Sequence, residues 1–325
     1  MKKDDKIFVA GHLGMVGSAL LRALKSEGYS NFALRSHDEL DLTIQKKVRS
    51  FFEEEQPDYV FLAAAQVGGI IANTTYRGEF IYSNLTIQTN VMDAAREYKT
   101  KRLMFLGSSC IYPKHCPQPI KEDYLLTGPL EKTNESYAIA KIAGLKMCEA
   151  YNYQYGTNYI SVMPTNLFGP NDTFDLETSH VMPALIRKIH EAKILKKNTV
   201  TVWGTGNPKR EFLHVDDMAS ACVFLMCEND FRDIVNIGTG SDLSIRELAE
   251  MICGIVGFNG ELKFDSSKPD GTPRKLLDIS RLKNLGWQPK ISLEQGIRST
   301  YSWFLENYTI KKVSQDISYT VFSHF

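Results

Sequence analysis

Short apolar runs alternate with amphipathic runs through the first half of the chain. The apolar runs predict buried strands at 7–10, 32–34, 59–62, 103–106 and 159–163. The amphipathic runs between them have a helical period and predict helices at 15–27, 44–55, 80–98 and 136–155. Strands that are apolar on both faces are typical of a parallel sheet covered by helices on both sides. We therefore expect an α/β fold with a doubly wound parallel sheet of the Rossmann type.

The pattern loosens after residue 168. Helices are predicted at 181–193, 216–228 and 244–255, and short strands at 199–202 and 235–237. We expect a larger domain formed by 1–168 together with about 214–240, and a smaller C-terminal domain formed by 169–213 and 241–325. The segment 310–325 has aromatic and β-branched residues without a clear period, so we predict no role for it.

Composition and charge exclude several classes of protein. The chain has 325 residues, 43% of them hydrophobic, and its 38 basic and 38 acidic residues give a formal net charge of zero. The basic residues between 187 and 197 are interpreted as a solvated helix face plus a contact with a nucleotide diphosphate. Because acidic residues elsewhere balance the charge, we expect no nucleic acid or membrane partner. No apolar run approaches the ~18 residues of a membrane span. The six cysteines lack CxxC spacing, so we expect reduced thiols, no metal site and a cytoplasmic protein.

A glycine-rich loop follows the first predicted strand and opens the first predicted helix. Gly11 permits a tight turn, Gly14 allows backbone to approach a pyrophosphate, and Gly17 allows the helix to pack closely on the strand. The N-terminus of the helix then supplies N–H donors for the phosphates. The GxxGxxG spacing resembles that of the extended short-chain dehydrogenase/reductase superfamily.

The end of the second predicted strand bears on the choice of cofactor. Dinucleotide-binding proteins that use NAD commonly place an acid there, but this chain has Arg35, Ser36 and His37. Arginine can pair bidentately with a 2′-phosphate, which favours NADP(H). The alternative is that Arg35 is a solvated loop residue and that the cofactor is NAD. The superfamily pattern places Asp41 and Leu42 near the adenine.

Tyr137 and Lys141 lie four residues apart on one face of a predicted helix. A nearby cation lowers the pKa of a phenol, which makes proton exchange easier. Ser108 follows the fourth strand, at the sheet edge where parallel sheets present ligands. Together these residues predict a site for hydride transfer, with Tyr137 as the proton donor or acceptor. The pair alone is weak evidence, because tyrosine and lysine at this spacing are common on helices.

Cys110 and His180 form a second candidate acid/base pair. Cys110 lies two residues after Ser108, and His180 precedes a predicted helix. An accessible thiolate and an imidazole on either side of a carbonyl can remove and return protons at the adjacent carbons. The alternatives are a small buried thiol and a helix-capping histidine.

Several longer motifs resemble the GDP-L-fucose synthase family, which epimerises and reduces a GDP-4-keto-6-deoxy sugar. The resemblance covers about residues 6 to 305 and lies in segments 11–18, 63–69, 107–113, 164–167, 179–181, 203–212 and 268–278. It implies that the larger domain binds NADP, that the smaller domain binds the GDP-sugar, and that the enzyme is a homodimer built through the helices at 80–98 and 136–155.

The resemblance also implies roles for individual residues. Cys110 and His180 are implied as base and acid at C3 and C5, and Tyr137, Lys141 and Ser108 as the group that reduces C4. The implied cofactor-binding residues are Gly11, His12, Leu13, Gly14, Met15, Val16, Gly17, Arg35, Ser36, His37, Asp41, Leu42, Ala63, Ala64, Leu106, Gly107, Lys141, Pro164, Thr165, Asn166, Leu167 and His180. The implied substrate-binding residues are Ser108, Asn166, Lys188, Trp203, Arg210 and Asp270.

The chain departs from the family pattern at a few positions. Leu13 stands where an arginine often helps to hold the 2′-phosphate, which leaves Arg35 and His37 for that role. Thr178 replaces a common asparagine, and Phe168 replaces a frequent tyrosine. These departures keep every proton-transfer group but allow a different GDP-sugar, such as a 6-deoxy-heptose or a 3,6-dideoxyhexose.

The sequence supports NADPH-dependent 3,5-epimerisation and 4-reduction of GDP-4-keto-6-deoxy-D-mannose to GDP-L-fucose as the first hypothesis. A C4 reductase with an idle Cys110 or His180 is the second. A sugar-nucleotide 4,6-dehydratase or C4 epimerase is the third, although Ser109 stands where dehydratases usually carry an acid. A non-catalytic NADP sensor is the fourth, and the intact Ser108, Tyr137 and Lys141 argue against it.

Overall fold

A parallel sheet of six strands organises the larger part of the molecule. The computed structural model describes residues 1–176, 179–228, 231–268 and 270–322. The order of strands in the sheet is β10-β5-β4-β3-β1-β2, and each neighbouring pair is parallel. The strands are β1 (Ile7–Ala10), β2 (Phe32–Ala33), β3 (Tyr59–Leu62), β4 (Arg102–Leu106), β5 (Tyr159–Pro164) and β10 (Ile234–Ile237). This sheet confirms the doubly wound α/β fold.

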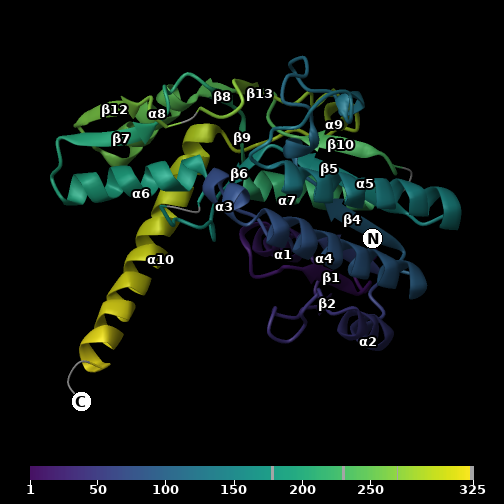
Figure 1. The fold of residues 1–325 in the computed structure, drawn as a ribbon. Coiled ribbons are helices and arrows are strands. Elements are labelled where there is room, and N and C mark those ends of the chain that lie inside the picture. The colour runs from purple at the N-terminus through teal and green to yellow at the C-terminus, as the bar shows by residue number, and fades with distance from the viewer. Residues whose placement is uncertain (177–178, 229–230, 269, 323–325) are drawn as a thin grey trace.

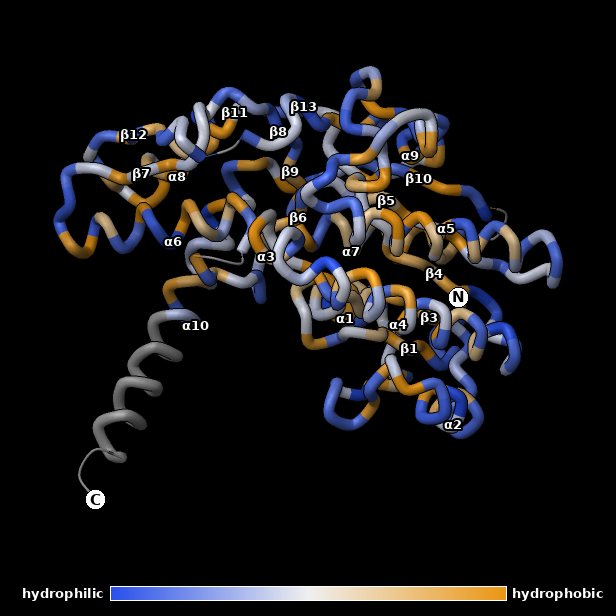
Figure 2. Tube along the Cα trace, in the orientation of Figure 1, coloured by the Kyte–Doolittle hydropathy of each residue, from blue (hydrophilic) through white to orange (hydrophobic). Residues whose placement is uncertain are grey.

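Helices cover both faces of this sheet (Figure 1). They are α1 (Met15–Ser26), α2 (Gln45–Glu55), α4 (Arg77–Glu97), α5 (Glu135–Tyr155) and α7 (Val215–Cys227). Neighbouring residues of one strand point to opposite faces of the sheet. Phe8 belongs to the hydrophobic cluster that includes residues of α2, α4 and α5, whereas Val9 belongs to the cluster that includes residues of α1 and α7. Figure 2 shows the strands as largely hydrophobic segments. Burial of both faces is what the continuous apolar runs predicted.

A second region lies beside the sheet and has its own hydrophobic core. It contains the parallel pair β7 (Thr199–Trp203) and β12 (Glu261–Asp265), with α6 (Val181–Ile194), α8 (Ile245–Val256) and the start of α10 (Leu293–Phe322). Ile186, Ile252 and Phe304 are fully or almost fully buried there. The rest of α10 extends away from the body of the molecule (Figure 1).

Short strands connect the two regions. β6 (Asn166–Phe168) pairs with β9 (Phe212–His214). In the chain, β6 directly follows β5, and β9 directly precedes α7. A second small sheet has the order β11-β8-β13 and contains β8 (Lys209–Arg210), β11 (Leu243–Ser244) and β13 (Arg274–Lys275). The remaining short elements are α3 (Ile70–Thr75), α9 (Ser280–Asn284), η1 (Ser109–Ile111) and η2 (Glu122–Tyr124). The small sheets bring Asn166, Arg210 and Lys275 toward the edge of the large sheet where β4 and β5 end.

The structure corrects some of the predicted element boundaries. The helix predicted at 80–98 begins at Arg77 in the structure. The prediction missed the first three residues because 77–79 are exposed and carry no apolar signal. The segment 310–322, for which no period was found, continues helix α10. The two-residue strands β8, β11 and β13 and the helix α9 were not predicted, since elements this short show no period. The domain boundaries remain a prediction. In the described part of the chain, no helix has the length and apolar character needed to span a membrane.

Candidate active site

The glycine loop lies between β1 and α1, as predicted. Gly11 has a φ of +83°, and a Cβ on Gly17 would lie only 2.1 Å from the Gly11 carbonyl oxygen. Only glycine therefore allows α1 to begin so close to β1. Gly14 is the N-cap residue, and among the described residues no side chain caps the helix there. The first N–H groups of α1, which include those of Met15 and Val16, therefore remain available for an anion.

Two further residues of the loop differ in burial. Leu13 is 70% exposed, whereas the Nδ1 atom of His12 is buried and has no hydrogen-bond partner among the described residues. Buried polar atoms are nearly always paired in folded proteins. An unpaired nitrogen beside a free helix N-terminus fits a loop that receives polar groups from a bound dinucleotide.

Arg35, which follows β2, is bound within the chain. Its guanidinium forms an ion pair with Glu55 at 2.6 Å and lies 5.5 Å from the ring centre of Phe51. Burial would raise the pKa of Glu55, but hydrogen bonds from Lys6 and Arg35 lower it below its usual value. The guanidinium is partly exposed, so its remaining N–H groups can meet a phosphate while Glu55 holds it in place.

The other predicted adenine-side residues belong to the loop between β2 and α2. The Ser36 amide donates to Glu39, and Asp41 accepts hydrogen bonds from the amide and hydroxyl of Thr43. Those hydrogen bonds lower the pKa of Asp41. Leu42 is nearly buried, and His37 lies in the same loop.

The remaining predicted cofactor residues lie where β3, β4 and β5 end. These are Ala63, Ala64, Leu106, Gly107, Pro164, Thr165, Asn166 and Leu167. Because the strands are parallel, these ends share one edge of the sheet with the glycine loop. A Cβ on Gly11 would lie 2.8 Å from the Ala64 amide nitrogen, so the two loops are in close contact. Thr165 and Asn166 both donate to the Glu211 carbonyl, which fixes the turn after β5.

Ser108, Tyr137 and Lys141 come together at the end of β4. The Lys141 ammonium donates to the Leu106 carbonyl at 2.8 Å and lies 5.8 Å from the ring centre of Tyr137. The Ser108 side chain lies near the phenol of Tyr137 and lowers its pKa. The structure therefore brings together the three residues predicted for reduction.

Burial shifts the pKa values of two of these groups in opposite directions. Desolvation raises the pKa of Tyr137, and the nearby Cys110 raises it further, although the Ser108 side chain lowers it. Desolvation lowers the pKa of Lys141 to about 7. At neutral pH the phenol therefore keeps its proton, while Lys141 can gain or lose one in response to a small change in its surroundings.

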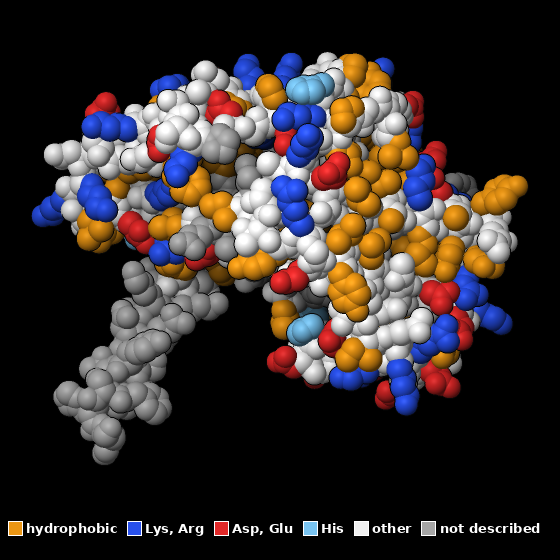
Figure 3. All heavy atoms as spheres, in the orientation of Figure 1, with side chains coloured by type: hydrophobic (Ala, Val, Ile, Leu, Met, Phe, Trp, Pro, Cys, Tyr) orange, Lys and Arg blue, Asp and Glu red, His pale blue; other side chains and the backbone are white. Residues whose placement is uncertain are grey.

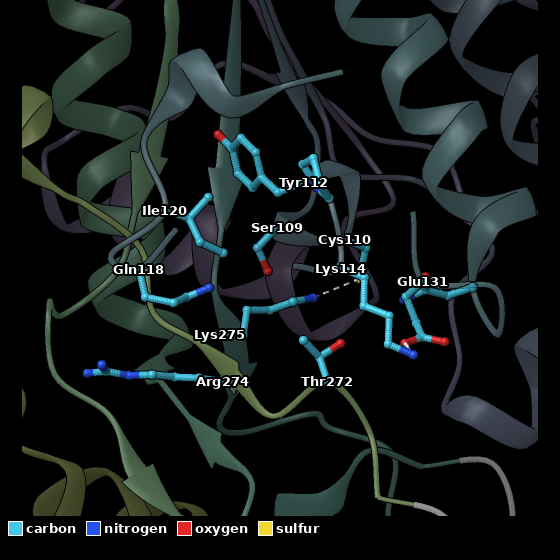
Figure 4. Close-up of a pocket in the computed structure, with 12 residues that line it drawn as sticks. Ser109, Cys110, Tyr112, Lys114, Gln118, Ile120, Glu131, Thr272, Arg274 and Lys275 are labelled. Carbon is cyan, nitrogen blue, oxygen red and sulfur yellow. Dashed lines mark hydrogen bonds and ion pairs between the residues drawn. The ribbon is translucent and has the colours of Figure 1, made fainter. Parts of the chain in front are cut away.

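Cys110 lies in η1, directly beside this group. Its amide donates to the Ser108 hydroxyl at 3.2 Å, and the Lys275 ammonium donates to its sulfur at 3.5 Å. Figure 4 shows Lys275 reaching from β13 toward Cys110 in a pocket that Ser109, Gln118 and Thr272 also line. The thiol is partly buried and lies in no disulfide. It is therefore a group that a ligand in the pocket can reach.

His180 is the N-cap residue of α6. Its ring keeps contact with solvent, but the protein around it removes part of its hydration. This desolvation lowers the pKa of His180, and the positive charge of Lys275 lowers it further. Cys110 and His180 therefore both lie within the electrostatic reach of Lys275.

The predicted GDP-sugar residues form two groups. Lys188 of α6 lies 4.7 Å from the ring centre of Trp203, which is 46% exposed at the end of β7. Arg210 of β8 is partly buried, and its charge interacts with Cys110. Asp270 accepts hydrogen bonds from the amide and hydroxyl of Thr205 at 2.9 and 2.7 Å. In this structure Asp270 therefore fixes the loop after β7.

The site also contains three residues that were not predicted from the sequence, Lys275, Glu211 and Lys268. Lys268 lies 5.5 Å from the ring centre of Trp203. Glu211 has 0% exposure, and its carboxylate accepts backbone hydrogen bonds from Thr239, Gly240 and Leu277. All three residues fall inside motifs that carried the family resemblance, but a motif does not show which neighbour each side chain meets.

The departures from the family pattern fall in different places. Phe168 is buried and packs against Phe212 and His214, so it contributes to the packing between β6 and β9. Thr178 lies outside the described residues. Among the described residues, no group of three or more His, Cys, Asp or Glu side chains could hold a metal ion.

Comparison with known proteins assigns the family. Residues 7–238 match the NAD dependent epimerase/dehydratase family. The chain is 60% identical over 305 residues to GDP-L-fucose synthase 1 of Arabidopsis thaliana, covering 94% of each chain. It is 55% identical over 312 residues to GDP-L-fucose synthase of Escherichia coli K12, covering 93% of this chain and 97% of that one. The solved GDP-mannoheptose C4 reductase of Campylobacter jejuni with NADP bound is 43% identical, with a TM-score of 0.87 over 94% and 99% of the two chains. This chain therefore belongs to the NAD dependent epimerase/dehydratase family, in the group of the GDP-L-fucose synthases.

Proposed function

We propose that this protein epimerises GDP-4-keto-6-deoxy-D-mannose at C3 and C5 and reduces it at C4, which yields GDP-L-fucose. The observation that carries the proposal is the position of Cys110, directly beside the reductive group of Ser108, Tyr137 and Lys141. A plain reductase needs no thiol at that point. Identities of 55 to 60% to proteins named GDP-L-fucose synthase support the same activity.

The C4 ketone explains how one site can serve three carbons. Hydrogens at C3 and C5 are acidic because both carbons are adjacent to the carbonyl. Cys110 in its thiolate form accepts a proton from the carbon, and the electron pair moves onto the C4 oxygen as an enolate. Ser108 and Tyr137 donate hydrogen bonds to that oxygen. His180 returns a proton to the opposite face, and its lowered pKa makes each protonated ring a stronger acid.

Reduction then uses the buried group at the end of β4. When bound, NADPH supplies a hydride to C4. Tyr137 gives its proton to the C4 oxygen. The phenol is protonated at neutral pH before this step because burial raises its pKa. Lys141 can carry a positive charge as the phenol loses that proton, and it can hold ribose hydroxyls of the cofactor.

We propose NADP(H) as the cofactor. As predicted from the sequence, the glycine loop and the ends of β2 to β5 would hold it. The free N-terminus of α1 fits the pyrophosphate, and Arg35 fits a 2′-phosphate. The C. jejuni relative with NADP bound supports this choice. Lys188, Trp203 and Arg210 are proposed for the GDP group, with the domain division expected from the sequence.

We further propose a homodimer that acts in the cytoplasm. Tyr82 on α4 and Ile139 and Tyr153 on α5 are large exposed hydrophobic residues. Figure 3 shows hydrophobic side chains gathered over these helices. Such a patch is typical of a protein interface. The mass in solution, measured by light scattering, tests the dimer, and a monomeric mass would contradict it.

The first experiment combines NADPH oxidation at 340 nm with isotope analysis. The wild-type protein receives GDP-4-keto-6-deoxy-D-mannose in D2O, and mass spectrometry locates deuterium in the product. We expect turnover with deuterium at C3 and C5. Turnover without that deuterium would mean C4 reduction alone. Cys110→Ser should suppress the incorporation while an already epimerised intermediate is still reduced.

A second candidate is a C4 reductase of a related GDP-4-keto sugar. The likeness to the GDP-mannoheptose C4 reductase favours it, because that protein shares 43% identity across nearly the whole chain. A 6-deoxy-heptose or a 3,6-dideoxyhexose would meet the same catalytic residues. Turnover that is faster with such a substrate than with the hexose would support this candidate.

A further inference from the structure

Lys275 occupies a position that the proposed reaction does not yet explain. Its ammonium donates a hydrogen bond to the sulfur of Cys110 at 3.5 Å, and its charge lowers the pKa of His180 (Figure 4). Lys275 therefore contacts one of the two groups proposed for proton transfer, and its charge acts on the other. We propose that Lys275 is a positioning residue for epimerisation, which holds Cys110 as a thiolate and aims its sulfur at the substrate. This inference rests on the proposed function.

The backbone around Lys275 is fixed from both sides. β13 pairs with β8 so that Lys275 lies opposite Arg210. The Leu276 amide donates to the Gln118 side chain at 2.8 Å, and the Leu277 amide donates to the buried Glu211 carboxylate at 3.0 Å. A cation on such a rigid support meets the thiol without a large loss of conformational freedom on each turnover.

Two other cations that line the pocket, Lys114 and Arg274, are already paired. Lys114 forms an ion pair with Glu131 at 2.8 Å, and Arg274 forms one with Asp242 at 2.6 Å. Within the described residues, no carboxylate lies within ion-pair distance of the Lys275 ammonium. Its charge is therefore less offset than theirs and can act on the thiol.

Three groups face Cys110 from the surrounding elements. Lys275 of β13 donates to the sulfur, and the charge of Arg210 on β8 interacts with it at longer range. The phenol of Tyr137 on α5 is the third group, and it is neutral at physiological pH because burial raises its pKa. Two of these three groups are cations, and only Lys275 among them donates a hydrogen bond to the sulfur.

The proton balance of the step is simple. A C–H bond of the substrate breaks, its electron pair passes to the C4 oxygen through the enolate, and an S–H bond forms on Cys110. Lys275 keeps its own protons throughout. Protonation removes the negative charge of the thiolate and weakens its attraction to Lys275. The cation therefore favours release of that proton to solvent, which restores the thiolate after each exchange.

The test measures thiolate formation directly in the free enzyme. Iodoacetamide alkylation of Cys110 is followed from pH 6 to 9 by peptide-resolved mass spectrometry, with the exposed Cys227 as an internal reference. We expect Lys275→Met to move the pH midpoint for Cys110 upward by about one to three pH units. Lys275→Arg should retain most of the wild-type profile. Lys114→Met removes a lysine from the same pocket and should move the midpoint by less than about half a unit, because Glu131 already pairs with it.

A second readout connects the thiolate to the reaction. Deuterium exchange at C3 and C5 is measured with saturating substrate, and we expect about tenfold or greater loss in Lys275→Met, with a smaller effect on reduction of an epimerised intermediate. An unchanged alkylation midpoint in a folded Lys275→Met variant would overturn the inference. A raised KM for the GDP-sugar with normal exchange at saturation would also overturn it, since Lys275 would then be a substrate ligand.

Failure of the proposed function gives a different result. Wild-type protein that reduces a GDP-4-keto sugar without exchanging C3 or C5 protons would contradict epimerisation itself. The alkylation profile needs no substrate, so the pairing of Lys275 with the thiolate is decided even in that case.

Discussion

The two parts of the candidate site are built in different ways. Ser108, Tyr137 and Lys141 come from adjacent elements of the large sheet and lie in or beside its core. Cys110 starts from the same sheet edge, but the groups that act with it come from α6 of the second region and from β13 of the small sheet that connects the two regions. The reductive group is thus complete within one region, whereas the epimerising group depends on both.

This difference separates a general reaction from a specific one. Hydride transfer to a ketone requires a fixed proton donor beside the cofactor, and a rigid sheet edge supplies it. Proton exchange at two particular carbons requires groups placed around one sugar. Residues of the second region can change without disturbing the reductive group, so related proteins can share reduction and differ in epimerisation.

The largest effect is expected from Tyr137→Phe. Loss of the proton donor should reduce the rate of C4 reduction by about 10²- to 10⁴-fold, while deuterium exchange at C3 and C5 continues. Parallel assays of NADPH oxidation and isotope exchange measure this. Tyr153→Phe, at a 95% exposed position on the same helix, serves as the control. Equal loss of both activities would show that the two groups are not separable.

A second effect concerns the cofactor side of the larger region. Arg35→Ala should weaken NADPH binding by about 10- to 100-fold, because a charge-assisted contact is lost, and should leave NADH binding nearly unchanged. Fluorescence titration with each cofactor tests this. Glu55→Gln, which frees Arg35 from its ion pair, should change NADPH binding far less. Equal weakening for both cofactors would remove Arg35 from the 2′-phosphate site.

A third effect is a dependence of stability on pH at the buried Lys141. Its pKa of about 7 in the folded protein lies below that of an unfolded chain, so the unfolded state binds more protons between pH 7 and 10. The contribution of Lys141 to stability should therefore rise with pH over this window. The stability of Lys141→Met relative to wild type should fall by about 2 kcal/mol from pH 7 to 9. Urea unfolding of both proteins at the two pH values measures it, and a constant difference would contradict the shifted pKa.

The smallest effect is expected at the exposed Leu13. Leu13→Arg adds a cation to the loop before α1, so NADPH should bind about three- to tenfold more tightly at low salt, corresponding to about 1 kcal/mol. The gain should shrink as ionic strength rises. Isothermal titration with NADPH and NADH separates the two cofactors. Tighter binding of both to the same extent would indicate a contact with the pyrophosphate instead.

The sequence was informative where one signal repeats. Apolar runs such as 159–163 predicted the central strands, because both faces of those strands are buried. Gly11 and Gly17 predicted the loop, because the close approach of α1 to β1 excludes any other residue. The reductive group followed from the spacing of Tyr137 and Lys141 and from the strand that precedes Ser108.

The sequence was less informative where contacts join distant segments. Lys275 lies 165 residues from Cys110 in the chain, and only the pairing of β13 with β8 brings them together. Such short strands leave no period in the sequence. Arg35 shows the same limit, since the motif predicted its position but not its ion pair with Glu55, which comes from the end of α2.

The buried carboxylate of Glu211 has a consequence for cooperativity. It accepts N–H groups from the turn after β10 and from the chain beyond β13, while its own carbonyl is bound by Thr165 and Asn166. The three N–H groups satisfy a carboxylate that would otherwise be buried alone, and the two side chains satisfy the backbone carbonyl, so these segments stabilise one another. The two regions should therefore open and close locally as one unit at this point. A substitution in any one of these segments should then destabilise all of them. Amide hydrogens that are far apart in the chain should have similar protection against hydrogen exchange.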